Sequence, residues 1–171
     1  MQFRDLTADE IEVRVQSATD KGAILLLYKN ARCDMNILDE TVGFDKWERE
    51  HYECKGNLFC RVKIKCGNEW VSKSDCGTES NTEAEKGEAS DSFKRACFNW
   101  GIGRELYTSP FIFVKASDCN IKQGKNGKPC CTDKFSVEKI RIENKQITGI
   151  SLTNLNTKKR CFVWTKEKEN K

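Results

Sequence analysis

A chain of 171 residues with 37% apolar side chains is long enough for one domain with a modest core. Its formal net charge of +4 favours anionic partners in general but does not by itself require nucleic acid. No stretch approaches the roughly 20 apolar residues of a membrane span, and the opening residues lack the basic and apolar regions of a signal peptide. We therefore expect a cytoplasmic protein that makes no membrane contact.

The ten cysteines do not have the spacing of a zinc site. Structural zinc sites combine C-x₂₋₄-C pairs with each other or with histidine pairs, whereas no C-x₂-C is present here and His51 is the only histidine. Most of the cysteines lie in apolar runs, where a free thiol behaves as a small buried hydrophobe. Cys119, Cys130 and Cys131 lie instead in a polar loop, where they could bind metal or be oxidised.

Three patterns indicate the elements of the first 43 residues. Thr7–Glu10 has the T-x-x-E spacing of a capping box, which predicts a short helical turn. The apolar run Ala23–Tyr28 is typical of a buried strand. Apolar residues at steps of four, three and four then predict a helix over residues 31–42, with Gly43 as its C-cap.

Residues 47–76 have the pattern of an antiparallel meander. Three runs, Trp47–Cys54, Leu58–Cys66 and Glu69–Cys76, are separated by short turns that contain Gly and Asn. In the second run the apolar side chains alternate with basic ones, which places Lys63 and Lys65 on the face away from the apolar side chains.

A helix follows the meander and ends at Gly101-Ile102-Gly103. Its apolar positions form one stripe at helical spacing: Ala89, Phe93, Ala96, Cys97 and Trp100. Lys94 and Arg95 fall on either side of that stripe. The glycines follow the helix instead of preceding it, so they predict a C-cap and not a phosphate cradle.

The remaining residues predict strands around a polar linker. Residues 111–114 are expected to form a strand, and residues 117–134 to form a flexible loop. Residues 135–142, 147–155 and 160–164 predict three further strands. The expected fold class is α+β: an antiparallel β-meander packed on a long helix, with a short N-terminal helical region and a C-terminal β-rich segment. We expect residues 1–116 to form the core and residues 117–171 to extend the same domain.

The sequence contains no recognisable catalytic motif. It lacks G-x-x-x-x-G-K-[ST] and a nucleophile elbow, and its acidic residues show no spacing that singles out a set. We therefore expect no enzymatic activity and no cofactor.

Basic residues are interleaved with aromatic ones on the meander and the helix after it. The basic residues are Lys63, Lys65, Lys73, Lys86, Lys94 and Arg95, and the aromatic ones on these and earlier elements are Tyr28, Trp47, Tyr52 and Trp70. Single-stranded nucleic acid is bound by this combination, because cations contact phosphates and aromatic faces stack on bases. The alternative is that the cations are solvated and the aromatic residues belong to the core.

The segments "VGFDKW" and "KGEASDSFKRACFNWGIGRELY" resemble the DNA-binding domain of the Rad fifty-two (Rad52) family of single-strand annealing proteins, and within it the short phage and prophage recombinase branch. The resemblance covers roughly residues 6–107. Its most specific part is D-x-x-K-R-A-x-x-x-x-G at Asp91–Gly101. The resemblance implies ATP-independent binding and annealing of single-stranded DNA by a homo-oligomer, either a ring or a filament. It also implies a bacterial host cytoplasm and a single-stranded DNA-binding protein as a further partner.

The resemblance assigns roles to individual residues. Arg14, Tyr28, Lys94 and Arg95 match positions of the family's inner DNA site, and Lys86 matches a basic position of a second, outer contact. Two positions depart from the family pattern. Phe98 replaces a further arginine of the helix, and the loop before the helix, which carries outer-site lysines in the family, is shortened to about residues 78–82.

Two other function classes stay open on the sequence alone. One is a metal-dependent enzyme or zinc-binding accessory protein of phage DNA metabolism, which would use acidic residues or the Cys119, Cys130 and Cys131 cluster. The other is a scaffold without salt-sensitive DNA binding.

Overall fold

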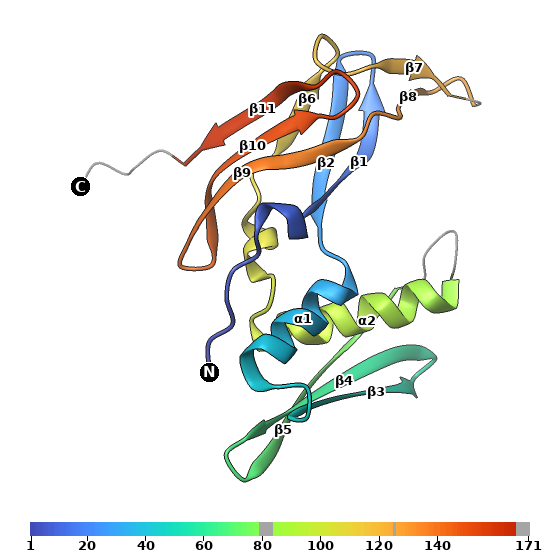
Figure 1. Ribbon diagram of the computed structural model, residues 1–171. Coiled ribbons are helices and arrows are strands. Elements are labelled where there is room, and N and C mark those ends of the chain that lie inside the picture. Colours follow the sequence, from blue (N-terminus) through green and yellow to red (C-terminus); the bar gives the residue numbers. More distant parts are fainter. Residues whose placement is uncertain (79–83, 125, 167–171) are drawn as a thin grey trace. The chain divides into compact units, whose positions relative to one another are not determined.

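Strands predominate in the computed structural model, which describes residues 1–78, 84–124 and 126–166 (Figure 1). The chain is 48% strand and 22% helical, and the described residues contain only two α-helices. The predicted α+β class, a meander on a long helix with an N-terminal helical region, is therefore wrong. The capping box gives only the 3₁₀ turn η1 (Ala8–Glu10), and the residues after it form the strand β1 (Glu12–Thr19).

The chain forms two compact units. Residues 1–4 and 30–103 form the first unit, and residues 5–29 and 104–171 form the second. The second unit is therefore assembled from segments that are far apart in the sequence. The domain division predicted from the sequence, at residue 116, stays a prediction.

The first unit contains a three-stranded antiparallel sheet with a helix on one face. The strands β3 (Trp47–Cys54), β4 (Asn57–Cys66) and β5 (Glu69–Cys76) are arranged in the order β3-β4-β5. The helix α2 (Ala84–Trp100) packs against β4 and β5. Cys60, Val62 and Ile64 of β4 are fully buried, as are Phe93, Ala96 and Cys97 of α2. The two predicted apolar patterns, alternating in β4 and helical in α2, thus form one core.

Capping residues mark both ends of α1 and the C-terminal end of α2. In α1 (Ala31–Val42) the side chain of Asn30 accepts a hydrogen bond from the Cys33 amide, and Gly43 follows the helix with φ +93°. Gly101 follows α2 with φ +104°. Left-handed backbone of this kind is readily adopted only by glycine, so both predicted C-caps are confirmed.

The second unit is built on a six-stranded sheet in the order β11-β10-β9-β1-β2-β6. Besides β1, its strands are β2 (Gly22–Tyr28), β6 (Ile112–Lys115), β9 (Phe135–Glu143), β10 (Gln146–Asn154) and β11 (Lys159–Thr165). The short helix η2 (Arg104–Thr108) precedes β6. All neighbouring strands are antiparallel. β1 and β9 pair only at Glu12–Ser136 and Val13–Phe135, so the sheet opens beyond these two pairs.

The segment predicted as a flexible loop contains a second, smaller sheet, so that prediction is wrong. The strands β7 (Ile121–Gln123) and β8 (Pro129–Cys131) form an antiparallel hairpin. The Asp133 carboxylate binds the base of this hairpin, because it accepts hydrogen bonds from the backbone and side-chain amides of Asn120 at 2.9–3.1 Å. It also accepts one from Asn154 of β10 at 2.7 Å.

Asp133 should make the second unit sensitive to acid. Burial would raise the pKa of Asp133, but the hydrogen bonds from Asn120 and Asn154 outweigh it and lower this pKa. The folded state therefore favours the carboxylate form, and this contribution to stability is lost as the pH falls through the folded-state pKa. We expect Asp133→Asn to lower the free energy of unfolding at pH 7 by about 1–3 kcal/mol, and by less at pH 2, in urea titrations.

The control for this experiment is Asp20→Asn, which removes an exposed carboxylate from the β1–β2 turn of the same unit. We expect it to leave the free energy of unfolding nearly unchanged at both pH values. An equal cost of Asp133→Asn at pH 7 and pH 2 would show that the charge of Asp133 contributes nothing.

Candidate nucleic-acid interface

Lys94 and Arg95 lie on the part of α2 that is not covered by the sheet of the first unit. Their neighbours Phe93, Ala96 and Cys97 are fully buried, whereas Arg95 is exposed and Lys94 is half-buried. The helical periodicity of the sequence therefore placed the pair correctly beside the apolar stripe.

Acidic residues of α2 attach the helix to the sheet. Asp91, the first residue of the D-x-x-K-R motif, accepts hydrogen bonds from the amide and hydroxyl of Thr78 at 3.1 and 3.3 Å. Glu88 accepts one from the amide of Leu58 at 3.1 Å. The start of β4 and the residue Thr78 beyond β5 are thus tied to the helix two turns and one turn before Lys94 and Arg95.

Arg95 and Lys94 differ in their surroundings. The Nε of Arg95 lies 3.3 Å from the carboxylate of Asp75 on β5. The second carboxylate oxygen of Asp75 accepts a hydrogen bond from the side chain of Asn99 at 3.4 Å. Within residues 1–78, 84–124 and 126–166, Lys94 forms no ion pair. The arrangement thus provides one oriented guanidinium beside one ammonium that is available to an anion.

Lys73 faces α2, although it was predicted to contact DNA. Its ammonium donates a hydrogen bond to the carbonyl of Asn99 at 2.8 Å and lies 4.7 Å from the centre of the Trp100 ring. Carbonyls at a helix C-terminus carry partial negative charge and are stabilised by a cation. We infer that the main role of Lys73 is to hold the end of α2.

A substitution of Lys73 should therefore affect stability more than DNA binding. We expect Lys73→Met to lower the free energy of unfolding by about 0.5–1.5 kcal/mol and to leave the salt dependence of DNA binding unchanged. The matched variant is Lys65→Met, because Lys65 is exposed on the opposite face of the sheet. It should leave stability unchanged, and a larger loss of stability for Lys65→Met than for Lys73→Met would contradict this assignment.

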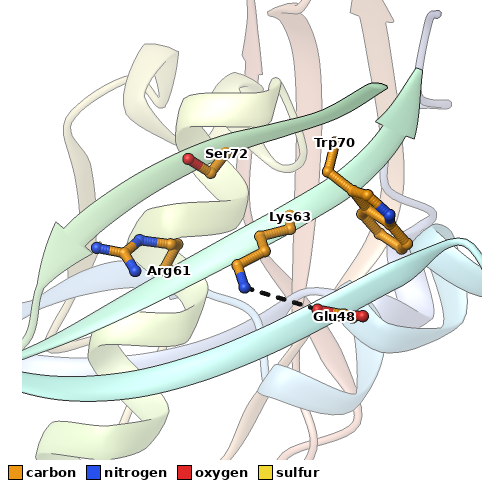
Figure 2. Close-up of a pocket in the computed structure, with 5 residues that line it drawn as sticks. All are labelled: Glu48, Arg61, Lys63, Trp70 and Ser72. Carbon is orange, nitrogen blue, oxygen red and sulfur yellow. Dashed lines mark ion pairs between the residues drawn. The ribbon is translucent and has the colours of Figure 1, made fainter. Parts of the chain in front are cut away.

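Lys63 and Lys65 lie on the face of the sheet that points away from α2. A depression on this face has a volume of about 510 Å³. In it Lys63 of β4 lies between Glu48 of β3 and Ser72 of β5, with Trp70 of β5 beside them (Figure 2). The ammonium of Lys63 is 3.7 Å from both Glu48 and Glu50. The charge of Lys63 is therefore partly neutralised within the protein.

Arg61 and the aromatic side chains complete this outer face. Arg61 is 3.1 Å from the carboxylate of Glu50 and lies over the Tyr52 ring at 4.6 Å. Tyr52 in turn stacks on Phe59, with ring centres 5.6 Å apart. Trp70 is 44% exposed. The face thus combines aromatic surface with basic and acidic side chains in nearly equal number.

Arg14 and Tyr28 are neighbours on adjacent strands of the second unit. The register pairs Glu12 with Tyr28, so Glu12, Arg14 and Tyr28 share one face of the sheet. The guanidinium of Arg14 is 5.2 Å from the centre of the Tyr28 ring and also forms an ion pair with Glu12. Tyr28 is 37% exposed. A cation beside an exposed ring is the arrangement that contacts a phosphate and a base together.

Seven of the eight predicted site residues fall into three groups. Arg14 and Tyr28 belong to the second unit. Lys73, Lys94 and Arg95 lie on or against α2 in the first unit, and Lys63 and Lys65 lie on the other face of its sheet. The backbone of Lys86 is in α2, but its side chain lies outside the described residues, as do residues 79–82 of the shortened loop.

Sequence reasoning missed the carboxylates that position the cations. Asp75 orients Arg95, and Asp91, in the middle of α2, binds the Thr78 amide beyond the end of β5. The alternation in Glu69–Cys76 places Asp75 on the same face as Lys73, so this signal was present in the sequence. The pairing of Lys63 with Glu48 depends on the register of β3 and β4, which the alternation does not determine.

The cysteines of the hairpin do not form a metal site. Among the described residues, no group of three or more His, Cys, Asp or Glu side chains is arranged to bind a metal ion. Cys130 and Cys131 are adjacent in β8, so their side chains point to opposite faces. Burial, with the neighbouring Cys131 as a further cause, raises the pKa of the Cys119 thiol to about 11. The predicted Cys119, Cys130 and Cys131 cluster thus has no ligand geometry in the described part.

None of the helices in the described ranges has both the length and the apolar composition needed to span a membrane.

The sequence model of the "Rad52/22 family double-strand break repair protein" matches residues 3–125 of the chain. No curated protein and no solved structure gives a significant match. The matched segment includes all eight predicted site residues and ends before β8–β11. The family resemblance is thus confirmed, whereas the phage branch stays a prediction.

Proposed function

The chain belongs to the Rad52/22 family of double-strand break repair proteins, and from this premise we propose that it binds single-stranded DNA and anneals complementary strands without ATP. The family acts in DNA recombination and repair through single-strand annealing in general. ATP independence, an absence of catalysis and the phage or prophage origin are the finer parts of the proposal.

The proposal is supported mainly by the position of Lys94 and Arg95, which lie together on α2, a helix that is hydrogen-bonded to the sheet of the first unit. Arg95 is oriented by Asp75 at 3.3 Å, so its guanidinium is held in place before DNA binds. A preorganised cation loses less conformational entropy when it binds a phosphate. Lys94 adds a second charge at the preceding helical position, about 100° around the axis from Arg95, so the two cations would contact different phosphates.

Annealing needs little chemistry from the protein, because base pairing supplies the free energy. The protein must neutralise phosphates, which otherwise repel the complementary strand, and must leave the base edges accessible. Lys94, Arg95 and Arg14 are proposed as phosphate ligands, and Tyr28 as a surface on which a base stacks. None of these roles requires a nucleotide-binding loop or a metal ion.

An oligomer would lengthen the strand that is held. One copy offers only the three proposed phosphate ligands Lys94, Arg95 and Arg14. A ring or filament would repeat these ligands along the DNA, and this multivalency would raise the overall affinity. We propose a homo-oligomer in the cytoplasm of a bacterial host, with a single-stranded DNA-binding protein as a further partner. Lys63, Lys65 and Lys86 are proposed as additional contacts, of which Lys63 is the weakest because Glu48 and Glu50 already pair with it.

The experiment that tests DNA binding is fluorescence anisotropy with labelled 30-nucleotide strands of different sequence at several salt concentrations. Phosphate contacts predict similar affinities for all sequences and a linear decrease of log K with log salt concentration. Strong preference for one sequence, or an affinity that does not depend on salt, would exclude binding through the phosphate backbone.

A further inference from the structure

Arg49 of β3 is held by an aromatic ring and not by a carboxylate. Its guanidinium carbon lies 5.1 Å from the centre of the Phe93 ring, and Arg49 is exposed. Among the side chains that the structure describes, no carboxylate pairs with Arg49. Other arginines of the described residues do form such ion pairs: Arg4, Arg14, Arg61, Arg95, Arg141 and Arg160. The guanidinium of Arg49 is therefore oriented, while its hydrogen-bond donors are available to a ligand.

The Phe93 ring is a firm support for this guanidinium. Phe93 is fully buried, and its ring also stacks on Trp47, with ring centres 6.1 Å apart. Trp47 in turn donates a hydrogen bond from Nε1 to the Asp39 carboxylate of α1 at 2.7 Å. A side chain that is already stacked on a fixed ring loses less conformational entropy when it binds a ligand. Arg49 is therefore preorganised for an anionic group.

Arg49 and α2 lie on the same face of the three-stranded sheet. The register places Arg49 opposite Val62, which is fully buried and whose carbonyl accepts a hydrogen bond from Trp100 of α2 at 3.1 Å. His51, two residues further along the same face of β3, has its Nε2 3.0 Å from the Ala89 carbonyl of α2. Because α2 packs mainly against β4 and β5, Arg49 lies beside the helix and not beneath it.

Lys94 projects from the side of α2 on which Arg49 lies. The opposite side, toward β5, is marked by Asn99, whose side chain donates a hydrogen bond to the Ser74 carbonyl at 3.1 Å. Successive helical residues are about 100° apart, so Asn99 lies about 120° from Phe93 in one direction around the axis. Lys94 lies about 100° from Phe93 in the other direction. Lys94 is therefore on the β3 side of α2, next to the ring that supports Arg49.

Carboxylates are also present on this face, so its net charge does not explain an affinity for anions. Glu88 and Asp91 of α2 accept hydrogen bonds from backbone amides at 3.1 Å. Glu53 lies on the same face of β3 as Arg49, four residues further along the strand. An anion would be bound here through the oriented donors of Arg49 and not through a broad positive field.

We propose that Arg49 binds a phosphate of single-stranded DNA on the β3 side of α2, next to the phosphate that Lys94 binds. The inference rests on the proposed function, because it adds a ligand to the DNA path of Lys94. A planar guanidinium donates two parallel hydrogen bonds to one phosphate, which an ammonium does not. Phosphate contacts carry no sequence information, so Arg49 should contribute equally to the binding of all sequences.

The test compares Arg49→Met with the wild type in anisotropy titrations of a labelled 30-nucleotide strand at several salt concentrations. Methionine keeps an unbranched side chain on the Phe93 ring but removes the charge. One lost phosphate contact should reduce the salt slope by about 0.7, which corresponds to a loss of about fivefold in affinity at 0.1 M salt. A wild-type slope and affinity in Arg49→Met would show that Arg49 only covers Phe93, and would refute the proposal.

The matched control is Arg61→Met. Arg61 also lies over an aromatic ring, that of Tyr52 at 4.6 Å, but it points to the other face of the sheet and pairs with Glu50 at 3.1 Å. Both substitutions change the net charge of the protein equally. We expect Arg61→Met to retain the wild-type salt slope. An equal loss of slope in the two variants would be general electrostatics and would refute a site at Arg49.

Unfolding in urea establishes that each variant is folded. If Arg49→Met does not fold, Arg49→Lys takes its place, because lysine retains the charge and an aliphatic chain over the ring. We expect Arg49→Lys to keep the wild-type slope but to bind more weakly, since an ammonium does not form the paired hydrogen bonds of a guanidinium. An affinity equal to that of the wild type would refute the proposed contact.

The result can be separated from that of the proposed function. A reduced salt slope in Arg49→Met, in a protein whose wild type does not anneal, supports Arg49 as a DNA ligand and refutes annealing. A wild-type slope in Arg49→Met, in a protein whose wild type does anneal, refutes the role of Arg49 and leaves annealing intact.

Discussion

Replacing Lys94 and Arg95 together by alanine is expected to slow ATP-free annealing about 100-fold while the protein stays folded. Each lost phosphate contact reduces the salt slope of single-strand binding by about 0.7, and an oligomer multiplies this loss along the strand. The measurement is the rate at which two labelled complementary strands anneal, read by energy transfer between their dyes. Unfolding in urea establishes that the variant is folded.

The control variant Arg32→Ala/Lys46→Ala removes one arginine and one lysine that are exposed elsewhere in the first unit. It should anneal at nearly the wild-type rate. Arg95→Lys separates charge from geometry, because lysine retains the charge but not the planar fork that Asp75 orients. Annealing by the double alanine variant at the wild-type rate would show that the pair is only a solvated helix face.

Tyr28→Ala is expected to weaken binding to single-stranded DNA by about 1–3 kcal/mol, which is the contribution of one stacked base. Duplex binding should change much less, because paired bases are not available for stacking on a side chain. Tyr28→Phe retains the ring beside Arg14, 5.2 Å from the guanidinium, and should bind like the wild type. The measurement is anisotropy with a single strand and with its duplex.

Phe111→Ala serves as the control for Tyr28→Ala, because Phe111 is 73% exposed in the same unit but is not a predicted site residue. It should leave both affinities unchanged. An equal loss for single strands and duplex in Tyr28→Ala would show that the ring supports Arg14 and does not stack on a base.

The sequence predicted the elements whose periodicity is local. The runs 47–54, 58–66 and 69–76 became β3, β4 and β5 within two residues, because alternation and glycine turns identify a meander. The strand β1 was missed, although Val13 and Val15 alternate with Glu12 and Arg14. The capping box before it predicted a short helical turn, and the expected fold class included a short N-terminal helical region, whereas only the three-residue η1 forms there.

The remaining features depend on contacts between distant parts of the chain. Each strand of the hairpin β7–β8 has only three residues. The Asp133 carboxylate at its base is held by a hydrogen bond from the side chain of Asn154, which lies 21 residues later in the chain. Strand order in the six-stranded sheet brings β1 beside β9, more than one hundred residues apart, which no local pattern encodes. The basic residues of the site could be identified from the sequence. The carboxylates that pair with them depend on the register between strands, which local patterns do not determine.

The central claim is annealing, and the most direct measurement is the annealing rate of two complementary labelled oligonucleotides with the wild-type protein at low salt, without ATP. We expect the protein to accelerate annealing, added ATP to change nothing, and high salt to abolish the acceleration. A rate equal to that of the DNA alone at low salt would contradict the account, even if the protein binds single strands.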